Sequence, residues 1–386
     1  MKYKMEDALE CIIDYRGKTP RKSEMGIPTL SAKSVKNGYI DYGECYYISE
    51  DEYARFMVRG FPKVGDILLT TEAPMGMVAR LDRDDVGIAQ RLITLRGKQG
   101  ILDNNYLMYY LQSPIGQGKL REKETGSTVT GIKQAEFRKI EIDIPDIDQQ
   151  LKISSMLYCL DKKIECNKAI NRNLQEQAFS MLDNMMLTHD PDDLCVLSEL
   201  ADINPKRSIS KNAEARCIDM AKLSTTGAFP DGWEYKLYTG GMKFINGDTV
   251  MARITPCLEN GKTAFIDFLD EGETAFGSTE YIVLSPKGEM PAEFLYCLAR
   301  YKSFVEYAVK NMNGTSGRQR VSGEAIGQYE IPRFTDEELR KFGSFAKAPF
   351  EAMRKNSIEN MKLAAMRDSL LPKLMSGELD VSDIDL

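Results

Sequence analysis

Residues 9–14, Leu-Glu-Cys-Ile-Ile-Asp, recur as Leu-Ser-Glu-Leu-Ala-Asp at residues 197–202, an offset of 188 positions. A basic residue follows at the same distance in both places, Lys18 after the first stretch and Lys206 after the second. Four more short matches keep the same order at offsets between 182 and 189: residues 65–70 with 247–252, 90–95 with 279–284, 126–128 with 314–316, and 144–145 with 331–332. Matches in one order at a nearly constant offset indicate an internal duplication. The chain is therefore predicted to be one structural unit used twice.

Each predicted unit begins with a globular part. Residues 1–147 and 196–334 combine Gly, Pro, Thr and Tyr with short apolar runs such as 66–70 (Asp-Ile-Leu-Leu-Thr), a pattern typical of strands and turns. Helical stretches at 104–112 and 291–309 lie among these runs. We therefore predict two globular domains of the α/β class, more closely α+β.

A long helix is expected after each globular part. Residues 148–187 contain no Gly or Pro, and residues 335–375 contain only Gly343, Pro349 and Pro372. Because proline lacks the backbone N–H, Pro349 should break or kink the second helix. The remaining segments are a polar linker at 188–195 and a C-terminal tail at 376–386.

Apolar residues recur in both helices at alternating spacings of four and three, which is the seam of a coiled coil. The predicted seam comprises Leu157, Leu160, Ile164, Asn167, Asn171 and Leu174 in the first helix and Met353, Asn356, Asn360, Leu363 and Leu370 in the second. A buried asparagine in such a seam costs stability and fixes register and partner. The alternative is that the four asparagines face solvent, which their recurrence in both copies disfavours.

The two helices are expected to pair with each other. At about 1.5 Å per residue, residues 151–186 would form a helix roughly 54 Å long, which could not bury its seam alone. Globular part and helix alternate twice along the chain, so an antiparallel coiled coil would relate the halves by a pseudo-twofold axis. The predicted architecture is a dumbbell with one globular domain at each end.

Composition excludes several classes of protein. The chain has 386 residues, with 51 Lys and Arg against 58 Asp and Glu, and its net charge of −7 argues against a polycationic or membrane-adsorbing protein. Its eight cysteines never form a Cys-x-x-Cys pair, which disfavours zinc ribbons and thioredoxin-type sites, so we expect reduced thiols in a cytoplasmic protein. The single histidine, His189, falls in the predicted linker, which nearly excludes histidine catalysis and multi-histidine metal sites. No run of about 18 apolar residues occurs and no apolar run follows the first lysines, so neither a membrane span nor a signal peptide is expected.

Catalytic motifs are missing as well. Gly261-Lys262-Thr263 is no phosphate-binding loop, because Pro256 stands where the motif requires its first glycine. Asn204-Pro205 is the nearest approach to the Asn/Asp-Pro-Pro-aromatic motif of amino-methyltransferases, and no glycine-rich cofactor loop accompanies it. We predict no catalytic site and no metal site, and we interpret the chain as a recognition protein.

Basic and polar clusters in the globular parts point to a ligand. They lie at residues 15–22, 119–123, 206–207 and 318–320. Arg, Lys, Gln and Thr are side chains that contact DNA phosphates and base edges. Each cluster alone is more often a solvated face, but Lys18 and Lys206 recur at corresponding positions, as do the Gly-Ser-Thr and Gly-Thr-Ser loops. A twofold molecule also suits duplex DNA, which repeats about every 34 Å.

In their order, these motifs resemble the specificity (S) subunits of type I restriction-modification systems. The resemblance rests on residues 9–20, 65–76 (Gly-Asp-Ile-Leu-Leu-Thr-Thr-Glu-Ala-Pro-Met-Gly), 88–91 (Ile-Ala-Gln-Arg), 126–128, 144–145 and the carboxyl-terminal stretch 366–379. It covers essentially the whole chain, and the order and duplication are more specific than any single motif. The second copy departs from the first at residues 252–256, so base contacts are not carried from one copy to the other.

The resemblance implies that residues 1–147 and 196–334 are two target-recognition domains, each reading one half of an interrupted DNA sequence. It also implies that the helices form a spacer and dock two methyltransferase (modification) subunits, followed by restriction/translocase subunits. S-adenosylmethionine, ATP and Mg would then belong to those partners, and this chain would hold no cofactor and carry out no catalysis.

Position and chemistry select the residues that we expect to approach DNA. They are Arg16, Lys18, Thr19, Gln90, Arg91, Ser127, Thr128 and Lys133 in the first domain and Lys206, Arg207, Arg253, Thr279, Thr315, Arg318, Gln319 and Arg320 in the second. Two other interpretations stay open. One is a recognition subunit that serves a fused methyltransferase-nuclease, and the other is a coiled-coil scaffold that binds only proteins, which the negative net charge favours.

Overall fold

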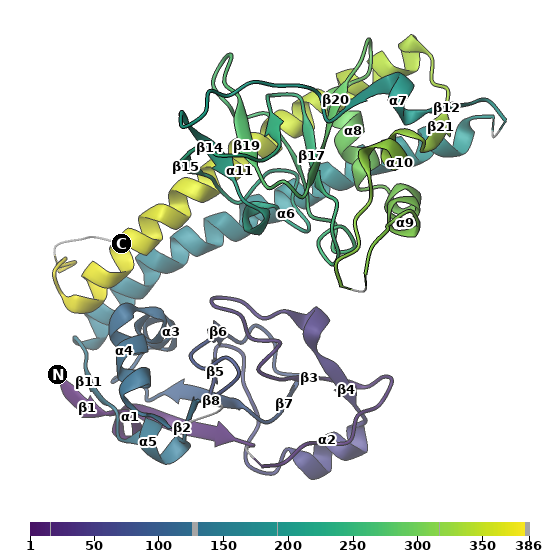
Figure 1. The fold of residues 1–386 in the computed structure, drawn as a ribbon. Coiled ribbons are helices and arrows are strands. Elements are labelled where there is room, and N and C mark those ends of the chain that lie inside the picture. Colours follow the sequence, from purple (N-terminus) through teal and green to yellow (C-terminus); the bar gives the residue numbers. More distant parts are fainter. Residues whose placement is uncertain (16, 126–129, 191, 316, 383–386) are drawn as a thin grey trace. The chain divides into compact units, whose positions relative to one another are not determined.

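The computed structural model describes residues 1–15, 17–125, 130–190, 192–315 and 317–382, and the chain divides into two compact units (Figure 1). Unit 1 comprises Met1–Lys162 and Ala365–Leu386, and unit 2 comprises Lys163–Ala364. Two long helices, α6 (Ile147–Thr188) and α11 (Asp336–Ser376), contribute a segment to both units. Each unit therefore combines one globular domain with parts of both helices.

The globular elements of the two units follow one another in chain order. Those of unit 1 are β1 (Lys2–Lys4), α1 (Met5–Ala8), β2 (Leu9–Asp14), β3 (Ile27–Leu30), η1 (Tyr42–Glu44), β4 (Tyr46–Ile48), α2 (Glu50–Phe56), β5 (Ile67–Thr70), β6 (Val78–Arg80), β7 (Gly87–Ile88), β8 (Leu92–Gly97), α3 (Asn104–Gln112), α4 (Pro114–Glu122), β9 (Glu124–Thr125), β10 (Gly131–Ile132), α5 (Gln134–Arg138) and β11 (Glu141–Asp143). Those of unit 2 are β12 (Leu194–Val196), α7 (Leu197–Leu200), β13 (Ala201–Ile203), β14 (Glu214–Ile218), η2 (Met220–Lys222), β15 (Glu234–Leu237), β16 (Lys243–Phe244), β17 (Thr249–Ala252), β18 (Thr263–Phe265), β19 (Ala275–Gly277), β20 (Tyr281–Pro286), α8 (Ala292–Ala299), α9 (Lys302–Lys310), α10 (Gly323–Gly327) and β21 (Glu330–Pro332).

The two units repeat one sheet topology. A four-stranded sheet has the order β2-β8-β5-β6 in unit 1 and β13-β20-β17-β18 in unit 2. The register repeats as well, because Ile67 pairs with Leu95 in unit 1 and Thr249 pairs with Leu284 in unit 2. A two-stranded ribbon accompanies each sheet, β1-β11 in one unit and β12-β21 in the other. The internal duplication predicted from the sequence is confirmed by this shared strand order.

The central strands are buried on both faces, which explains their continuous apolar runs. In β5 of unit 1, Ile67 and Leu69 belong to one hydrophobic cluster, while Leu68 between them belongs to another. In β17 of unit 2, Met251 and Val250 are divided between two clusters in the same way. Successive strand residues point to opposite faces, so a strand covered on both sides needs apolar residues at every position.

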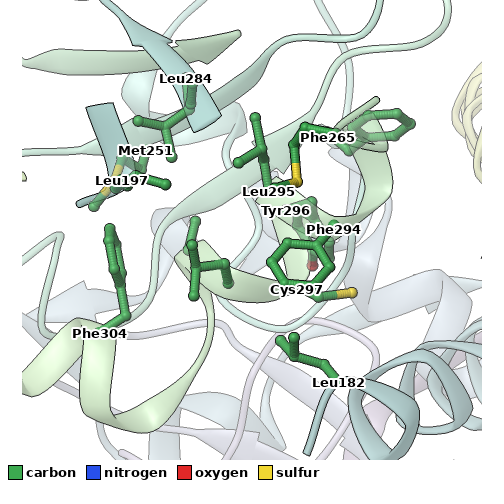
Figure 2. Packing of buried hydrophobic residues seen from close by; sticks show 14 of the residues in the cluster. Leu182, Leu197, Met251, Phe265, Leu284, Phe294, Leu295, Tyr296, Cys297 and Phe304 are labelled. Atoms are coloured by element: carbon green, nitrogen blue, oxygen red, sulfur yellow. The ribbon is translucent and has the colours of Figure 1, made fainter. Parts of the chain in front are cut away.

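The larger core of unit 2 joins the sheet to the helices (Figure 2). Met251 and Leu284 come from the sheet, Leu295 comes from α8, Phe304 comes from α9, and Leu182 comes from α6. All five have an exposed fraction of 0%. The domain therefore folds directly onto the long helix.

Two tyrosines also tie the domains to α6. Tyr109 of α3 donates a hydrogen bond to Asp161 at 2.7 Å in unit 1, and Tyr296 of α8 donates to Gln175 at 3.2 Å in unit 2. Both helices follow the last strand of their four-stranded sheet. The predicted helix at 104–112 is α3, whereas the stretch 291–309 forms two helices, because Tyr301 is extended (φ −69°, ψ 134°) and starts α9.

The helix α11 runs without interruption through Pro349. Of the two predicted effects of this proline, the break is therefore wrong, and the kink stays a prediction. Ala346 and Phe350 on either side of it, and Met353 one turn further on, are buried in the core of unit 2. Their packing holds the helix where the missing N–H of proline would otherwise end it.

Within unit 2, α6 and α11 are joined by asparagines in antiparallel order. Asn167 donates to Asn360 at 2.9 Å, and Asn356 donates to Asn171 at 2.8 Å. The residue number rises along one helix while it falls along the other, and the two helices lie side by side in Figure 1. Asn167 is 1% exposed, so the alternative that these asparagines face solvent is wrong.

The other predicted seam positions are also withdrawn from solvent. The seven apolar positions of the seam are all buried or half-buried. In unit 1, Arg367 of α11 donates to Asp161 of α6 at 2.7 Å, which continues the same antiparallel order within that unit. Each unit thus contains its own stretch of helix-to-helix contact.

The segments expected as linker and tail are more structured than their polarity indicates. In the linker, β12 pairs with β21, and the His189 ring packs edge-on against Phe334 with ring centres 4.6 Å apart. In the tail, Val381 is buried and Ser382 accepts a hydrogen bond from Gln149 at 2.9 Å. Short strand pairing and single apolar anchors explain why polar composition alone is misleading there.

Two further predictions concern membrane-spanning helices and the cysteines. No helix in the described part of the chain is both long and apolar enough to cross a membrane. The eight cysteines are all free thiols, of which Cys159 and Cys166 are exposed.

Candidate nucleic-acid interface

Three loops of unit 2 meet at one edge of its four-stranded sheet. They follow β17, precede β20 and precede α10. The backbone N–H of Arg253 donates to the Glu280 carbonyl at 3.0 Å, and that of Val321 donates to the Arg253 carbonyl at 3.0 Å. Thr255 and Gln319 exchange backbone contacts as well, with the Thr255 N–H donating to the Gln319 carbonyl at 3.1 Å. Residues far apart in the sequence are thus fixed beside one another.

A carboxylate between two guanidinium groups occupies this edge. Arg320 donates to Glu280 through Nε at 2.9 Å and through Nη2 at 2.7 Å, and the Arg253 Nε lies 3.8 Å from the same carboxylate. The hydrogen bonds from Arg320 lower the pKa of Glu280. The side chains of all three residues are only partly exposed. This edge, called the unit 2 edge below, therefore presents an ordered group of charges.

The unit 2 edge brings most of the predicted residues of the second domain together. Arg253, Gln319 and Arg320 are half-buried, and Thr279, next to Glu280, is exposed. Thr315 and Arg318 are exposed in the loop that ends at Arg320. The Arg318 carbonyl accepts a hydrogen bond from Arg320 Nη1 at 3.2 Å, which ties this loop to the carboxylate.

Lys206 and Arg207 are neighbours with different surroundings. Lys206 is exposed. Arg207 points inward and donates through Nη2 to both carboxylate oxygens of Asp248, at 2.9 and 3.1 Å, and to Ser285 at 3.1 Å. Asp248 is 1% exposed, and burial raises its pKa while Arg207 and the Ile245 N–H oppose that shift. Arg207 therefore neutralises a buried carboxylate, and we withdraw it from the expected DNA contacts.

Unit 1 forms the same buried pair with a different arginine. Arg96 of β8 donates to the two oxygens of Asp66, both at 2.7 Å. Asp66 and Asp248 precede corresponding strands, β5 and β17. The carboxylate is kept at one place in both units, but its partner comes from β8 in unit 1 and from the segment after β13 in unit 2.

The equivalent edge of unit 1, called the unit 1 edge below, has the same backbone contacts. The Thr71 N–H donates to the Arg91 carbonyl at 2.9 Å, and the Ile132 N–H donates to the Thr71 carbonyl at 2.9 Å. The Arg91 side chain is exposed and lies 3.8 Å from Glu72, and its backbone has a positive φ of 70°. Gln90 is half-buried next to it, and Lys133 is exposed directly after β10. Gln90, Arg91 and Lys133 thus share one edge.

The other predicted residues of unit 1 are placed differently. Lys18 and Thr19 are exposed in the loop after β2. That loop starts at Tyr15, whose hydroxyl donates to the Gly60 carbonyl and accepts from the Arg59 N–H, both at 2.8 Å. Arg16, Ser127 and Thr128 lie outside the described residues.

The chemistry of the two edges is that of hydrogen-bond recognition. Guanidinium, ammonium, amide and hydroxyl groups converge there with one carboxylate in each unit. Among the described residues, no three His, Cys, Asp or Glu side chains are grouped so that they could hold a metal ion. Such an arrangement suits a polyanion with hydrogen-bonding edges, of which DNA is one.

The chain is similar in sequence to several known proteins. Residues 15–176 match the family described as "Type I restriction modification DNA specificity domain". The chain is 25% identical to the type I restriction enzyme MjaIX specificity subunit of Methanocaldococcus jannaschii, over 93% of this chain and 88% of that protein. It is 34% identical to the EcoAI specificity subunit of Escherichia coli, over 38% of this chain and 25% of that protein. The chain is thus similar to type I restriction enzyme specificity subunits.

A solved type I specificity subunit has the same overall fold. The crystal structure of the S subunit from M. genitalium matches this structure over 97% of this chain and 95% of that chain. The TM-score is 0.57 and the sequence identity is 17%. The similarity supports a mixed α/β fold with two domains. The relatives are named as specificity subunits, which agrees with the interpretation of this chain as a recognition protein.

Sequence reasoning missed the carboxylates Glu72 and Glu280 at the two edges. Basic, amide and hydroxyl side chains are the types expected to contact DNA, whereas both of these residues are acidic. The available signal was their position, because Glu72 follows the matched run 65–70 and Glu280 follows Thr279 in the matched run 279–284.

Proposed function

We propose that this chain is the DNA sequence-specificity subunit of a type I restriction-modification complex, and that each globular domain reads one half of a bipartite target. The observation that carries the proposal is that both units build the same three-loop edge but fill it with different polar side chains. Duplex DNA offers the same backbone everywhere and different base edges, so a repeated frame with divergent side chains suits its two half-sites.

The proposed DNA contacts follow from exposure and position. They are Lys18, Thr19, Gln90, Arg91 and Lys133 in unit 1, Lys206, Arg253, Thr279, Thr315, Arg318, Gln319 and Arg320 in unit 2, and Arg16, Ser127 and Thr128 outside the described residues. The exposed lysines are suited to phosphates, because an ammonium group acts as a point charge. The arginines held by hydrogen bonds are better suited to base edges.

The long helices are proposed as the spacer between the half-sites. Residues 148–187 and 335–375 would form an antiparallel coiled coil that separates domains 1–147 and 196–334 in a pseudo-twofold dumbbell. The hydrogen bonds between Asn167 and Asn360 and between Asn171 and Asn356 support this pairing. The length of the coiled coil would then set the number of base pairs between the two half-sites.

The proposal also assigns the chemistry to partner proteins. Two methyltransferase subunits would dock on the helices, and restriction/translocase subunits would join them. S-adenosylmethionine, ATP and Mg would act in those subunits, and the complex would work in the cytoplasm on double-stranded DNA.

The test is a methylome comparison of the native host with and without the gene, combined with affinity purification of the tagged chain. Loss of one bipartite methylated motif, together with recovery of separate methyltransferase and restriction subunits, would support the proposal. Recovery of one fused methyltransferase-nuclease would favour the second interpretation. If every methylated motif survived deletion while proteins still co-purified, the chain would be a protein scaffold and the proposal would fail.

A further inference from the structure

Both edges pair a carboxylate with a guanidinium group, but the paired residues do not all occupy corresponding positions of the two units. The residue whose carbonyl accepts the conserved backbone hydrogen bond before the last sheet strand is Arg91 in unit 1 and Glu280 in unit 2. The loop opposite it supplies Glu72 in unit 1 and Arg253 in unit 2, and the carboxylate lies 3.8 Å from the guanidinium in both cases. Arg91 and Glu280 therefore place opposite charges at one corresponding position, whereas Arg253 corresponds to Thr71 and Glu72 corresponds to Ile254.

Unit 2 adds a second guanidinium group to this frame. A β-bridge joins Glu72 to Gly131 in unit 1, and the corresponding bridge joins Ile254 to Arg320 in unit 2. Where unit 1 has no side chain, unit 2 therefore has the arginine that contacts Glu280. Two backbone hydrogen bonds of this frame recur in both units, from Thr71 to Arg91 and from Ile132 to Thr71 in unit 1 and from Arg253 to Glu280 and from Val321 to Arg253 in unit 2.

The contacts of Arg320 leave specific donors available. Glu280 takes Nε–H and one hydrogen of Nη2, and the Arg318 carbonyl takes one hydrogen of Nη1. A guanidinium group has five N–H donors. One N–H on each terminal nitrogen thus has no partner among the described residues. Arg253 is held less tightly, since its buried Nε has no hydrogen-bond partner in the described part of the chain.

We propose that Glu280 is a positioning residue that holds Arg320, with Arg253 beside it, to read a guanine in the half-site of unit 2. The corresponding place in unit 1, with Glu72 and Arg91, then reads a different base pair. This inference rests on the proposed function and names specificity-determining residues within it.

The chemistry favours a base over a phosphate. Guanine presents two adjacent acceptors, O6 and N7, in the major groove, and arginine is its commonest specific partner. A carboxylate that fixes the guanidinium plane lowers the entropy cost of such a two-point contact. The same carboxylate opposes attraction to a phosphate, because its negative charge lies within hydrogen-bonding distance of Arg320. The cluster is therefore a poor phosphate clamp and a good directional donor.

The test replaces the native gene in its host with single variants and sequences the methylome. Arg320→Lys keeps the charge and removes the planar fork, and Glu280→Gln removes the charge that holds it. We expect both variants to relax one guanine position in one half of the motif, with about tenfold to hundredfold less discrimination there for Arg320→Lys. The other half of the motif should be unchanged.

A matched control is Lys302→Ala, which removes an exposed charge from α9 of the same unit. It should leave the motif intact, and thermal unfolding of each purified variant shows that the domain has folded. Full discrimination at every position in both Arg320→Lys and Glu280→Gln would overturn this inference alone. A motif that persists after deletion of the whole gene would instead overturn the proposed function.

Discussion

Asn167 and Asn360 hydrogen-bond to each other between α6 and α11, with 2.9 Å between Nδ2 of Asn167 and Oδ1 of Asn360. Asn167 also donates to Glu359 at 2.7 Å, a contact that lowers the pKa of that carboxyl. The neighbouring pair, Asn356 and Asn171, repeats the arrangement at 2.8 Å. A seam built in this way favours one register, because sliding either helix would leave buried amides without partners.

Replacing Asn167 with alanine should destabilise unit 2 by about 1 kcal/mol, because its hydrogen bonds to Asn360 and Glu359 are lost. Denaturant-induced unfolding of the full chain measures this change. Asn173→Ala is the matched control, since Asn173 is exposed on the same helix. Equal stability of the two variants would show that the Asn167 contacts contribute nothing to folding.

The adjacent residues Lys206 and Arg207 should respond in opposite ways to alanine. Arg207→Ala leaves Asp248 buried without its guanidinium, so we expect a loss of about 3–5 kcal/mol in unfolding free energy. Lys206→Ala should change stability by less than about 0.5 kcal/mol, because the side chain is exposed. Thermal unfolding distinguishes the two, and a stable Arg207→Ala protein would contradict the role assigned to this ion pair.

These two residues also mark what sequence can and cannot predict. Both residues are basic and adjacent, so the sequence predicts the same role for them. The structure shows that Arg207, unlike Lys206, hydrogen-bonds to the buried Asp248. The same holds for Glu280, whose partner Arg320 is 40 positions away. Such contacts depend on which loops are adjacent in the folded protein, and a local sequence pattern does not predict which loops these are.

Other features could be predicted because their cause is local or repeated. Residues 67–69 are all apolar because β5 is covered on both faces. The asparagines at 167, 171, 356 and 360 lie on heptad positions, so their burial follows from spacing. The break predicted at Pro349 does not occur because its effect depends on packing. Burial of the Ala346 and Phe350 side chains outweighs the cost of the backbone hydrogen bond that proline cannot form.

Acid should weaken the charge cluster of the unit 2 edge. The hydrogen bonds from Arg320 place the pKa of Glu280 in the folded protein below its unfolded value of about 4.3. The stabilisation of the folded protein by the Glu280 carboxylate is therefore complete above the pKa that Glu280 has in the unfolded chain. It is lost as the pH falls through the lower pKa that Glu280 has in the folded protein. We expect Glu280→Gln to be less stable than the native protein at neutral pH, and the difference to shrink below about pH 4.

Thermal unfolding of both proteins across this pH range measures the effect. Glu306→Gln is a suitable control, because Glu306 pairs with Lys302 on a largely exposed surface of α9. A difference between native protein and Glu280→Gln that stayed constant from neutral to acidic pH would show that the substitution acts through packing and not through charge.

The exposed arginine Arg318 provides a test of DNA contact that is independent of base reading. Its side chain lies in the loop that ends at Arg320, and its carbonyl helps to hold that residue. If Arg318 contacts a phosphate, Arg318→Ala should weaken binding of the assembled complex to all sequences alike. The slope of log affinity against log salt should then fall by about one charge.

Binding measured at several salt concentrations, on target and non-target duplexes, checks both expectations. Because alanine keeps the backbone carbonyl that contacts Arg320, discrimination between the two duplexes should be unchanged. Unaltered affinity and slope would place Arg318 away from the DNA backbone.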